Sequence, residues 1–257
     1  MDKRANRLDG KIALVTGAGR RLGRAIALAL AEGGADLLLH VHASSGEEVR
    51  RCVEEMGRRA LVLEADLSLR GGTLHLVQAA SAAFGRIDIL VNNAAVFFPT
   101  PLTEISIHTW RTVLHTNLTA PFVLSVGLGR FMRRQKEGGA IIQLADWSGI
   151  RPVPGFLPYC VSKGGGLALT QVLAKALAPY VKVNAIAPGP VLPPAHYDET
   201  ALHTLVHRTP LRRLGREQDV TRAVCFLANP GNFVTGATYL VEGGWLAGVG
   251  GGSDTSL

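Results

Sequence analysis

The chain has 257 residues, of which 47% are hydrophobic and 18% charged, and its formal net charge is +7. That length is enough for one large α/β domain, or two small ones, with a sizeable buried core. No apolar run is long enough to span a membrane, and the charged residues 1–7 are not followed by the apolar stretch of a signal peptide, so a cytoplasmic protein is expected. The three scattered cysteines lack CxxC spacing, which argues against a disulfide framework and a zinc site.

The positive charge suits an anionic partner such as nucleic acid, an acidic metabolite or a phosphorylated cofactor. The densest basic group, within residues 130–136, closes a helical pattern where cations favour the C-terminal end, so a solvated helix end is favoured over a nucleic-acid patch. His203 and His207 are four residues apart without an HExxH pattern or a third ligand, so no metal site is expected there. Neither these histidines nor His196 receives a role.

Short apolar runs rich in β-forming residues alternate with helical patterns along the chain. The expected strands are residues 12–16, 36–40, 60–64, 87–91, 140–144, 181–185 and 238–241. Continuous apolar strands separated by helices are typical of a parallel sheet covered on both faces, because parallel strands need long crossover connections. We therefore predict an α/β chain with a single doubly wound Rossmann fold, in which helices flank a seven-stranded parallel sheet.

No linker rich in proline or serine divides the chain. One domain is expected over residues 11–247, after an N-terminal extension at residues 1–10. Residues 188–213 follow a strand and are rich in Pro, His and Arg, and a loop in that position can cover a substrate. Residues 248–257 are expected to form a flexible C-terminal tail.

A glycine-rich loop follows the first expected strand and opens a helix. Its glycines let backbone N–H groups approach a phosphate, and the helix N-terminus favours negative charge. Gly17, Arg20, Arg21 and Leu22 are therefore predicted to bind a dinucleotide cofactor. The alternative is a glycine-rich turn that binds no ligand, which the strand before and the helix after it disfavour.

The second expected strand ends without an Asp or Glu that could bind an unmodified ribose 2′-hydroxyl. NADPH is therefore favoured over NADH as the cofactor. Arg21, His42 and Ser44 can instead offer a cation and hydrogen-bond donors to a 2′-phosphate.

Asp146, Tyr159 and Lys163 form the most informative constellation. Tyr159 and Lys163 are four residues apart, so a helix would place both side chains on one face. A tyrosine hydroxyl has a pKa of about 10, and a fixed cation that lowers this pKa makes it a better proton donor near neutrality. Lys163 is the candidate cation, and Asp146 could face the same substrate. Such a pair also occurs by chance on helix surfaces, so the spacing alone leaves surface packing open.

These residues together resemble the short-chain dehydrogenase/reductase family over nearly the whole chain, from Lys11 to about Trp245. The markers are the glycine-rich loop, Asp66-Leu67, Asn92-Asn93-Ala94, Asn117, Tyr159-x-x-x-Lys163, Pro188-Gly189 and Val241-Glu242-Gly243-Gly244. The further cofactor-binding residues that the resemblance implies are Asp66 and Leu67 at the adenine, Asn93, Ala94, Tyr159, Lys163, Pro188 and Gly189. It also implies that Tyr159 is the acid, that Lys163 lowers its pKa and binds the nicotinamide ribose, and that Asn117 holds a water linked to Lys163.

Two departures from the common family pattern resemble its pteridine reductase branch. Arg21 stands where the family usually has a middle glycine, and Asp146 stands where it usually has a catalytic serine. Residues 92–102, with the sequence NNAAVFFPTPL, resemble that branch as well. A pterin is a flat heteroaromatic with ring N–H and amino donors, so an aromatic face and a carboxylate suit it. The implied substrate-binding residues are Arg21, Ala95, Phe97, Asp146 and Tyr159.

Phe97 would stack on the pterin opposite the nicotinamide, although Phe97 and Phe98 can also be read as hydrophobic anchors of a loop. Other positions depart from the branch. Ala43 lies where it can carry an arginine beside the 2′-phosphate, and Ala95 where it can carry a serine. The residues after Gly189 lack the threonine that many family members place near the nicotinamide amide.

The leading hypothesis is an NADPH-dependent reductase of pteridines, of the dihydropterin or dihydrofolate type. Hydride would pass to a ring C=N bond, and the proton would come through Tyr159, Asp146 or a water that they hold. The alternatives are a reductase of ordinary carbonyls, such as 3-oxoacyl thioesters, and a non-catalytic NADPH-binding regulator on the same fold. The expected partner is a small pteridine rather than nucleic acid or a membrane, and a homotetramer is expected by family resemblance.

Overall fold

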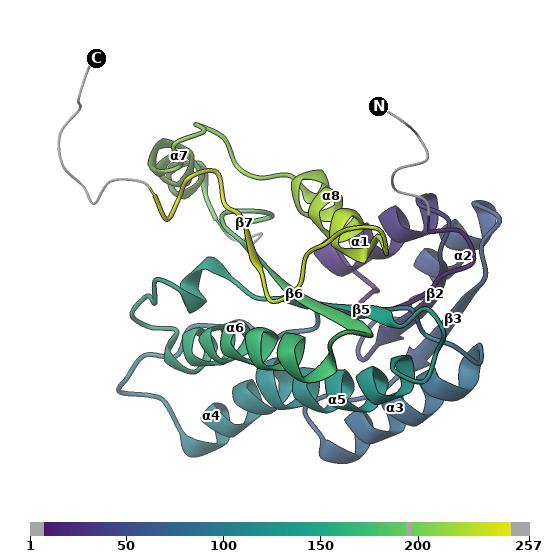
Figure 1. Ribbon diagram of the computed structural model, residues 1–257. Coiled ribbons are helices and arrows are strands. Elements are labelled where there is room, and N and C mark those ends of the chain that lie inside the picture. Colours follow the sequence, from purple (N-terminus) through teal and green to yellow (C-terminus); the bar gives the residue numbers. More distant parts are fainter. Residues whose placement is uncertain (1–7, 194–196, 248–257) are drawn as a thin grey trace.

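The computed structural model describes residues 8–193 and 197–247. Seven strands form one sheet in the order β3-β2-β1-β4-β5-β6-β7, and all neighbours run parallel (Figure 1). The strands are β1 (Ile12–Thr16), β2 (Asp36–Val41), β3 (Ala60–Glu64), β4 (Ile89–Asn92), β5 (Gly139–Leu144), β6 (Val181–Pro188) and β7 (Thr238–Val241). The predicted doubly wound fold with a seven-stranded parallel sheet is confirmed.

The strand ends differ slightly from the expected ranges. Strand β6 runs on to Pro188 and β2 to Val41, so both reach further toward the carboxyl-terminal edge than their apolar patterns indicated. Strand β4 begins at Ile89 instead of residue 87, where the Asp88 carboxylate accepts the Ile12 N–H at 2.9 Å. A side chain thus takes the place of a backbone acceptor at the entrance of this strand.

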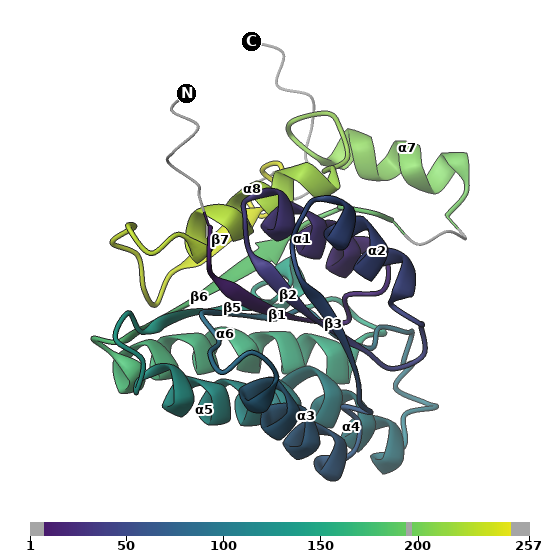
Figure 2. The ribbon, with the colours of Figure 1, turned by 90° about the vertical axis from the view of Figure 1, so that its right-hand side faces the viewer.

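Helices cover both faces of the sheet, as Figure 2 shows from the side. They are α1 (Arg21–Glu32), α2 (Glu47–Glu55), α3 (Arg70–Ala83), α4 (Ile107–Leu114), α5 (Ala120–Met132), α6 (Leu157–Leu177), α7 (Glu199–Arg208) and α8 (Glu217–Ala228). Helices α1, α2 and α8 lie on one face, and α3 to α6 lie on the other. Each layer closes its own apolar core against the sheet, because strands buried on both faces expose apolar side chains to both layers.

The order of the strands determines where a ligand-binding crevice can form. Strands β1, β2 and β3 progress toward one edge of the sheet, whereas β4 to β7 progress toward the other. The connections at the carboxyl ends of β1 and β4 therefore diverge and leave a crevice between them, which is where open α/β sheets bind ligands. The sequence motifs that follow β1, β4, β5 and β6 all lie along this edge.

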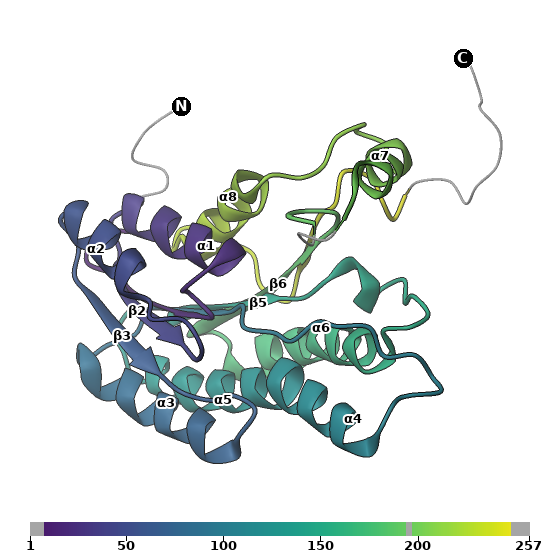
Figure 3. The same cartoon turned by 180° about the vertical axis from the view of Figure 1, so that it is seen from behind.

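Helix α7 lies within the predicted substrate loop, residues 188–213, and stands away from the two helix layers (Figure 3). None of its residues is buried. His196, most of the predicted N-terminal extension (residues 1–7) and the predicted tail (residues 248–257) lie outside the described residues. No helix within residues 8–193 and 197–247 is long and apolar enough to cross a membrane.

Three consecutive glycines interrupt the apolar pattern of α6. A Cβ at position 165 would lie 2.8 Å from the Cδ2 of Leu118, so close packing within the chain accounts for Gly165. A Cβ at position 166 would have no neighbour within 4 Å. The homotetramer expected by family resemblance stays a prediction.

Candidate active site

The glycine-rich loop between β1 and α1 is built by close approaches that leave no room for side chains. Gly17 has a φ of +66°, and a Cβ on Gly23 would lie 2.0 Å from the Gly17 carbonyl oxygen. A Cβ on Gly19 would lie 2.0 Å from the Ser44 hydroxyl. The loop can therefore present its backbone at the N-terminus of α1, which is the arrangement that binds a pyrophosphate.

Arg21 occupies a strained position in this loop. Its φ is +49°, in the left-handed region that glycine favours and that costs other residues about 1 kcal/mol or more. The guanidinium donates to the Leu192 carbonyl oxygen at 2.5 Å, and so it ties the glycine-rich loop to the segment after β6. Backbone strain of this kind persists at functional sites, where a particular side chain is required.

Two predicted cofactor residues, His42 and Ser44, follow the carboxyl end of β2. His42 is exposed and Ser44 lies against Gly19, and neither is accompanied by a carboxylate at the strand end. The nearest acidic residues along the chain, Glu47 and Glu48, already accept from Arg50 and Arg24 respectively. The predicted preference for NADPH over NADH stays a prediction.

A network of hydrogen bonds joins the carboxyl ends of β1 and β4. Thr16 Oγ1 accepts the backbone N–H groups of Asn93 and Ala94 at 2.9 and 3.0 Å. The Asn93 amide donates to the Thr16 carbonyl oxygen at 2.8 Å. The side chain of Asn93 thus holds the strand ends together, while Ala94 packs partly against the core and Ala95 is exposed. Thr16 has this role without having been singled out in the sequence.

The remaining predicted cofactor residues also lie along this edge. Asp66 follows β3, and its carboxylate accepts the Ser68 N–H at 2.8 Å, while Leu67 is buried. Hydrogen bonding from Ser68 lowers the pKa of Asp66, so this carboxylate is ionised. Pro188 ends β6, and the Gly189 N–H donates to the Val241 carbonyl oxygen.

Asp146, Tyr159 and Lys163 meet at the carboxyl end of β5. The Tyr159 hydroxyl donates to Asp146 Oδ2 at 3.2 Å, and the other carboxylate oxygen accepts the Ser148 N–H at 2.8 Å. Lys163 is 6% exposed, donates to the Leu144 carbonyl oxygen at 2.7 Å, and has its Nζ 5.5 Å from the centre of the Tyr159 ring. The predicted trio therefore shares one site.

The electrostatics of the trio differ from the sequence prediction. Burial, followed by the charge and hydrogen bond of Asp146, raises the pKa of Tyr159 well above its usual value. The expected lowering by Lys163 was wrong for this structure, because the carboxylate contacts the hydroxyl directly whereas the ammonium lies beside the ring. Burial lowers the pKa of Lys163 to about 8, against a smaller opposing effect of Asp146.

Asn117 lies in a π-helical turn, His115–Thr119, between α4 and α5. Its amide oxygen accepts the Val96 N–H at 2.8 Å, and its amide nitrogen donates to the Val96 carbonyl oxygen at 3.0 Å and to Ser162 Oγ at 3.3 Å. Asn117 thereby fixes the segment after β4 beside α6. Its expected link to Lys163 through a water stays a prediction.

Comparison with known proteins identifies this arrangement. The family described as Enoyl-(Acyl carrier protein) reductase matches residues 17–246. The chain belongs to the short-chain dehydrogenase/reductase family. It is an oxidoreductase of that type, which confirms the family resemblance of the sequence motifs, whereas the pteridine reductase branch stays a prediction.

Relatives with different names share the scaffold. A 2-dehydro-3-deoxy-D-gluconate 5-dehydrogenase of Dickeya dadantii (strain 3937) is 37% identical over 250 residues, which cover 93% of this chain and 97% of that protein. A 3-oxoacyl-(acyl-carrier-protein) reductase of Synechocystis sp. is 33% identical over 245 residues, covering 93% and 98%. The crystal structure of a blue fluorescent protein from a metagenomic library, in complex with NADPH, has a TM-score of 0.84 and 32% identity, and covers 93% of this chain and 99% of that one.

Two aromatic rings, those of Phe97 and Phe156, form an aromatic wall beside Tyr159. Phe97 stacks on Phe156 with ring centres 4.7 Å apart and planes 4° apart, and meets the edge of Tyr159, also at 4.7 Å. A bridge between Thr100 and Phe156 brings these two segments together. Phe97 remains 52% exposed, so it lies at the site with free surface. Phe156 was missed in the sequence because only the long-range bridge places it there.

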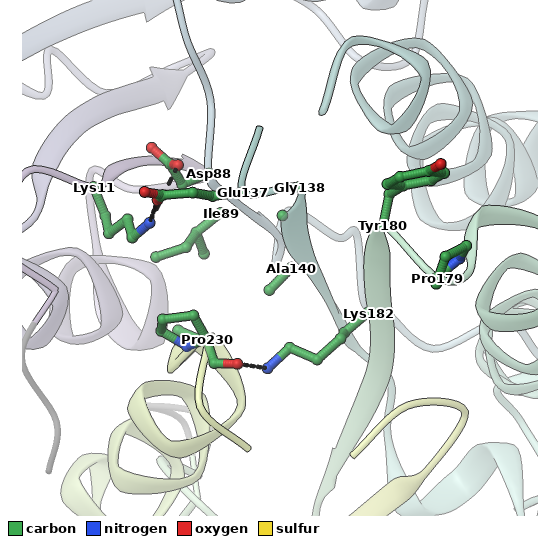
Figure 4. Close-up of a pocket in the computed structure, with 12 residues that line it drawn as sticks. Lys11, Asp88, Ile89, Glu137, Gly138, Ala140, Pro179, Tyr180, Lys182 and Pro230 are labelled. Carbon is green, nitrogen blue, oxygen red and sulfur yellow. Dashed lines mark hydrogen bonds and ion pairs between the residues drawn. The ribbon is translucent and has the colours of Figure 1, made fainter. Parts of the chain in front are cut away.

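A cavity of about 140 Å³ opens at the opposite, amino-terminal edge of the sheet (Figure 4). Lys11, Asp88, Glu137 and Lys182 line it. Lys11 pairs with Glu137 and with Asp88, and Lys182 donates to the Asn229 carbonyl oxygen at 2.6 Å. These charges are already satisfied within the fold, and the cavity lies at the other end of the strands from Asp146, Tyr159 and Lys163.

His203 and His207 lie on α7 with their Nε2 atoms 3.0 Å apart. One imidazole must donate to the other, and Arg212 lies 3.3 Å from His207 Nδ1. Within residues 8–193 and 197–247, no group of three or more His, Cys, Asp or Glu is arranged to hold a metal ion. This pair therefore adds no group to the family's catalytic site.

Proposed function

We propose that the chain is an NADPH-dependent reductase of pteridine rings. The observation that carries the proposal is the contact of the Asp146 carboxylate with the Tyr159 hydroxyl, at 3.2 Å, in a site that most relatives by resemblance build around a serine. A serine hydroxyl can donate to a substrate carbonyl oxygen, whereas a carboxylate only accepts. Asp146 therefore suits a substrate that presents N–H groups, as the pyrimidine ring of a pterin does.

The same contact favours reduction over oxidation. An enzyme that oxidises an alcohol needs a tyrosinate as its base, and Asp146 opposes that ion because it raises the pKa of Tyr159. Tyr159 therefore keeps its proton, as a proton donor must, while its raised pKa makes it a weaker acid than a free tyrosine. Its proton can pass to a ring nitrogen or to an intervening water, while Asp146 accepts hydrogen bonds from the substrate and keeps the hydroxyl oriented.

The aromatic wall supports a flat substrate. Phe97 is exposed beside Tyr159 and is itself supported by Phe156, so a planar ring can pack against a surface that is already held in place. The exposed Arg21 adds a cation between the glycine-rich loop and the substrate segment. Ala95 and Phe97 would contact the ring, and Asp146 its amino group.

The cofactor-binding residues suit NADPH. When bound, this cofactor supplies a hydride to the substrate. Gly17 and Leu22 would hold the pyrophosphate, Arg20, Arg21, His42 and Ser44 the 2′-phosphate, and Asp66 and Leu67 the adenine. Lys163 would bind the nicotinamide ribose, with Asn93, Ala94, Pro188 and Gly189 closing the site around the ring.

The second candidate is a reductase of ketones. The names of the relatives favour it, since they concern a sugar acid and an acyl thioester. In such an enzyme Asp146 would replace the serine without changing the substrate class.

A substrate panel with purified protein decides between the two. NADPH oxidation would be followed with dihydropterins, dihydrofolate, a 3-oxoacyl thioester and 2-dehydro-3-deoxy-D-gluconate. We expect pteridines to be reduced most efficiently. If the thioester or the sugar acid is turned over far better than any pteridine, the ketone reductase takes the place of our proposal.

Substitution of Asp146 tests the observation itself. Asp146→Ser should lower pteridine turnover by about 10²-fold, the scale of a lost proton-transfer partner, while activity on a simple ketone survives or appears. Asp146→Asn is the matched variant, because it keeps the shape and removes the charge. Full pteridine activity in both variants would sink the assignment of this carboxylate.

Phe97→Ala tests the aromatic wall. It should raise the KM for the pteridine about fivefold through lost stacking, with little change in NADPH affinity. Phe98→Ala is the control, since Phe98 is also exposed, at 40%, on the same segment. Equal effects of the two substitutions would make Phe97 a loop anchor rather than a substrate contact.

A further inference from the structure

A buried imidazole lies directly behind the glycine-rich loop. His40 is on β2 and is 2% exposed. Its Nδ1 accepts the Gly17 N–H at 3.1 Å, and its Nε2 lies 3.0 Å from the Ala65 carbonyl oxygen. A carbonyl oxygen only accepts, so Nε2 must carry the proton and Nδ1 must be the acceptor. These two backbone contacts fix both the tautomer and the neutral state of the ring.

The two contacts join two neighbouring segments of the cofactor crevice. Gly17 begins the loop that would face the pyrophosphate, and Ala65 immediately precedes Asp66 and Leu67, which would face the adenine. The backbone carbonyl oxygen of His40 also accepts the Ala18 N–H at 2.9 Å. One residue of β2 therefore holds both the first turn of the glycine-rich loop and the start of the adenine segment.

Packing alone does not explain an imidazole at this position, because an apolar side chain would fill the same space. Neighbouring strand residues such as Leu38 and Leu39 are fully buried with apolar side chains, so the core here has no general need for a polar group. Burying an imidazole is favourable only where both nitrogens find partners. Burial, with a smaller contribution from His42, lowers the pKa of His40, which agrees with a neutral ring near pH 7.

We propose that His40 is a positioning residue for the dinucleotide cofactor. Through its Nδ1 contact with the Gly17 N–H it holds the glycine-rich loop in the conformation that binds phosphate, and through its Nε2 contact with Ala65 it sets the distance from this loop to the adenine segment. The ring itself does not touch the cofactor. The inference rests on the cofactor site of the proposed function but not on the identity of the substrate.

Two isosteric substitutions separate the two contacts. In His40→Asn the amide oxygen can take the place of Nδ1 and keep the acceptor for Gly17. In His40→Gln the amide nitrogen can take the place of Nε2 and keep the donor to Ala65, while the Gly17 N–H loses its partner. His40→Leu removes both contacts and keeps a buried apolar side chain.

The measurements are the dissociation constant of NADPH from nucleotide fluorescence, without any substrate, and the exchange rate of the Gly17 amide hydrogen. We expect His40→Gln to raise the dissociation constant about tenfold and to speed the exchange, His40→Asn to stay within about threefold of the unaltered protein, and His40→Leu to be at least as weak as His40→Gln. At saturating NADPH, kcat should change less than about twofold in His40→Asn and His40→Gln.

Thermal unfolding of each variant is measured in parallel, and binding is compared well below every midpoint. Equal dissociation constants for the Asn and Gln variants, or a lowered midpoint with unchanged NADPH affinity, would show that His40 only supports the fold and would overturn the proposal. If the unaltered protein binds neither NADPH nor NADH, the proposed function fails by itself. The Gly17 exchange rates still decide whether His40 holds the loop.

Discussion

At the amino-terminal end of the sheet the charged side chains of Asp88 and Lys182 have hydrogen-bond partners, whereas toward the carboxyl-terminal end several buried polar atoms have none. Asp88 is bound by Arg86 and by the Ile12 N–H, and Lys182 by the carbonyl oxygen of Asn229 and the side chain of Asn232. Within the described residues, the buried side-chain atoms that lack a hydrogen-bond partner are Asn92 Oδ1, Thr116 Oγ1 and Ser148 Oγ.

All three of these atoms belong to residues within two positions of a predicted site residue. Asn92 ends β4, Thr116 precedes Asn117, and Ser148 lies two residues after Asp146. The strained Arg21 lies on the same edge. Unsatisfied groups and backbone strain reduce stability, and they persist where function requires them. The amino-terminal edge is thus fully satisfied within the fold, whereas the carboxyl-terminal edge, where we propose the chemistry, keeps unpartnered groups and backbone strain.

The largest expected effect is at the proton donor. Tyr159→Phe should lower turnover by about 10³-fold, because it removes the hydroxyl that reaches Asp146, while the dissociation constant of NADPH stays nearly unchanged. Single-turnover kinetics and nucleotide fluorescence would measure the two quantities. Turnover near that of the unaltered protein would remove Tyr159 from the mechanism and weaken the contrast between the two edges.

The next effect concerns Lys163 and pH. Its pKa is lowered to about 8, so the ammonium is charged below that pH and neutral above it. We expect kcat/KM for NADPH to fall as the pH rises through about 8, and Lys163→Met to lower it by about 10²-fold and to abolish this limb of the profile. A limb that persists in Lys163→Met would belong to another group.

Stability should respond to the same residue in the opposite direction. The folded state releases the Lys163 proton near pH 8, whereas the unfolded chain keeps it up to the ordinary value of 10.5. Because the unfolded state then holds more protons, the contribution of Lys163 to the free energy of unfolding rises with pH between these values. Urea unfolding of the Met variant, in which this contribution is absent, is the reference.

At the amino-terminal edge, substitutions should change stability and leave activity unchanged. Asp88→Asn should lower the free energy of unfolding by about 2 kcal/mol, because it weakens the buried acceptor of Arg86, and it should leave kcat and KM unchanged. Glu137→Gln, at an exposed partner of the same cluster, should cost less than about 0.5 kcal/mol. A loss of activity in Asp88→Asn at full stability would break the comparison.

The smallest of these expected effects is at Arg21, and it refines the comparison between the two edges of the sheet. Arg21→Gly relieves the left-handed backbone and should raise the free energy of unfolding by about 1 kcal/mol. The same substitution should weaken NADPH binding about tenfold while changing NADH binding less, because the guanidinium is predicted to serve the 2′-phosphate. If both cofactors weaken alike, Arg21 shapes the loop rather than selecting the cofactor.

The sequence predicts this fold well because each buried strand is a continuous apolar run and each crossover is helical. It also predicts the glycine-rich loop, since Gly17 and Gly23 stand where backbones approach closely. The ends of the strands are predicted less accurately. Strand β4, for example, begins at Ile89 and not at residue 87, because the Asp88 side chain replaces a backbone acceptor. Local patterns fix the elements but not the residue at which hydrogen bonding begins.

Some features of the site could not be predicted from the sequence, because they depend on contacts between distant segments. Phe156 joins Phe97 only through a bridge between distant segments, and His40 looks like an ordinary strand residue until its two partners are seen. The effect on the pKa of Tyr159 was misjudged because sequence spacing brought Lys163 near and said nothing of how closely Asp146 would approach. Distances of a few ångströms decide such effects, and sequence separation does not set them.

The π-helical turn at His115–Thr119 has a consequence for chain length. Such a turn holds one residue more than an α-helical turn. Deleting one residue there would restore a regular α-helical turn and keep α4 and α5 in register, so Leu124 would stay in the core, whereas Asn117 would lose its place opposite Val96. The additional residue of this turn therefore serves the placement of Asn117 and not the packing of the two helices.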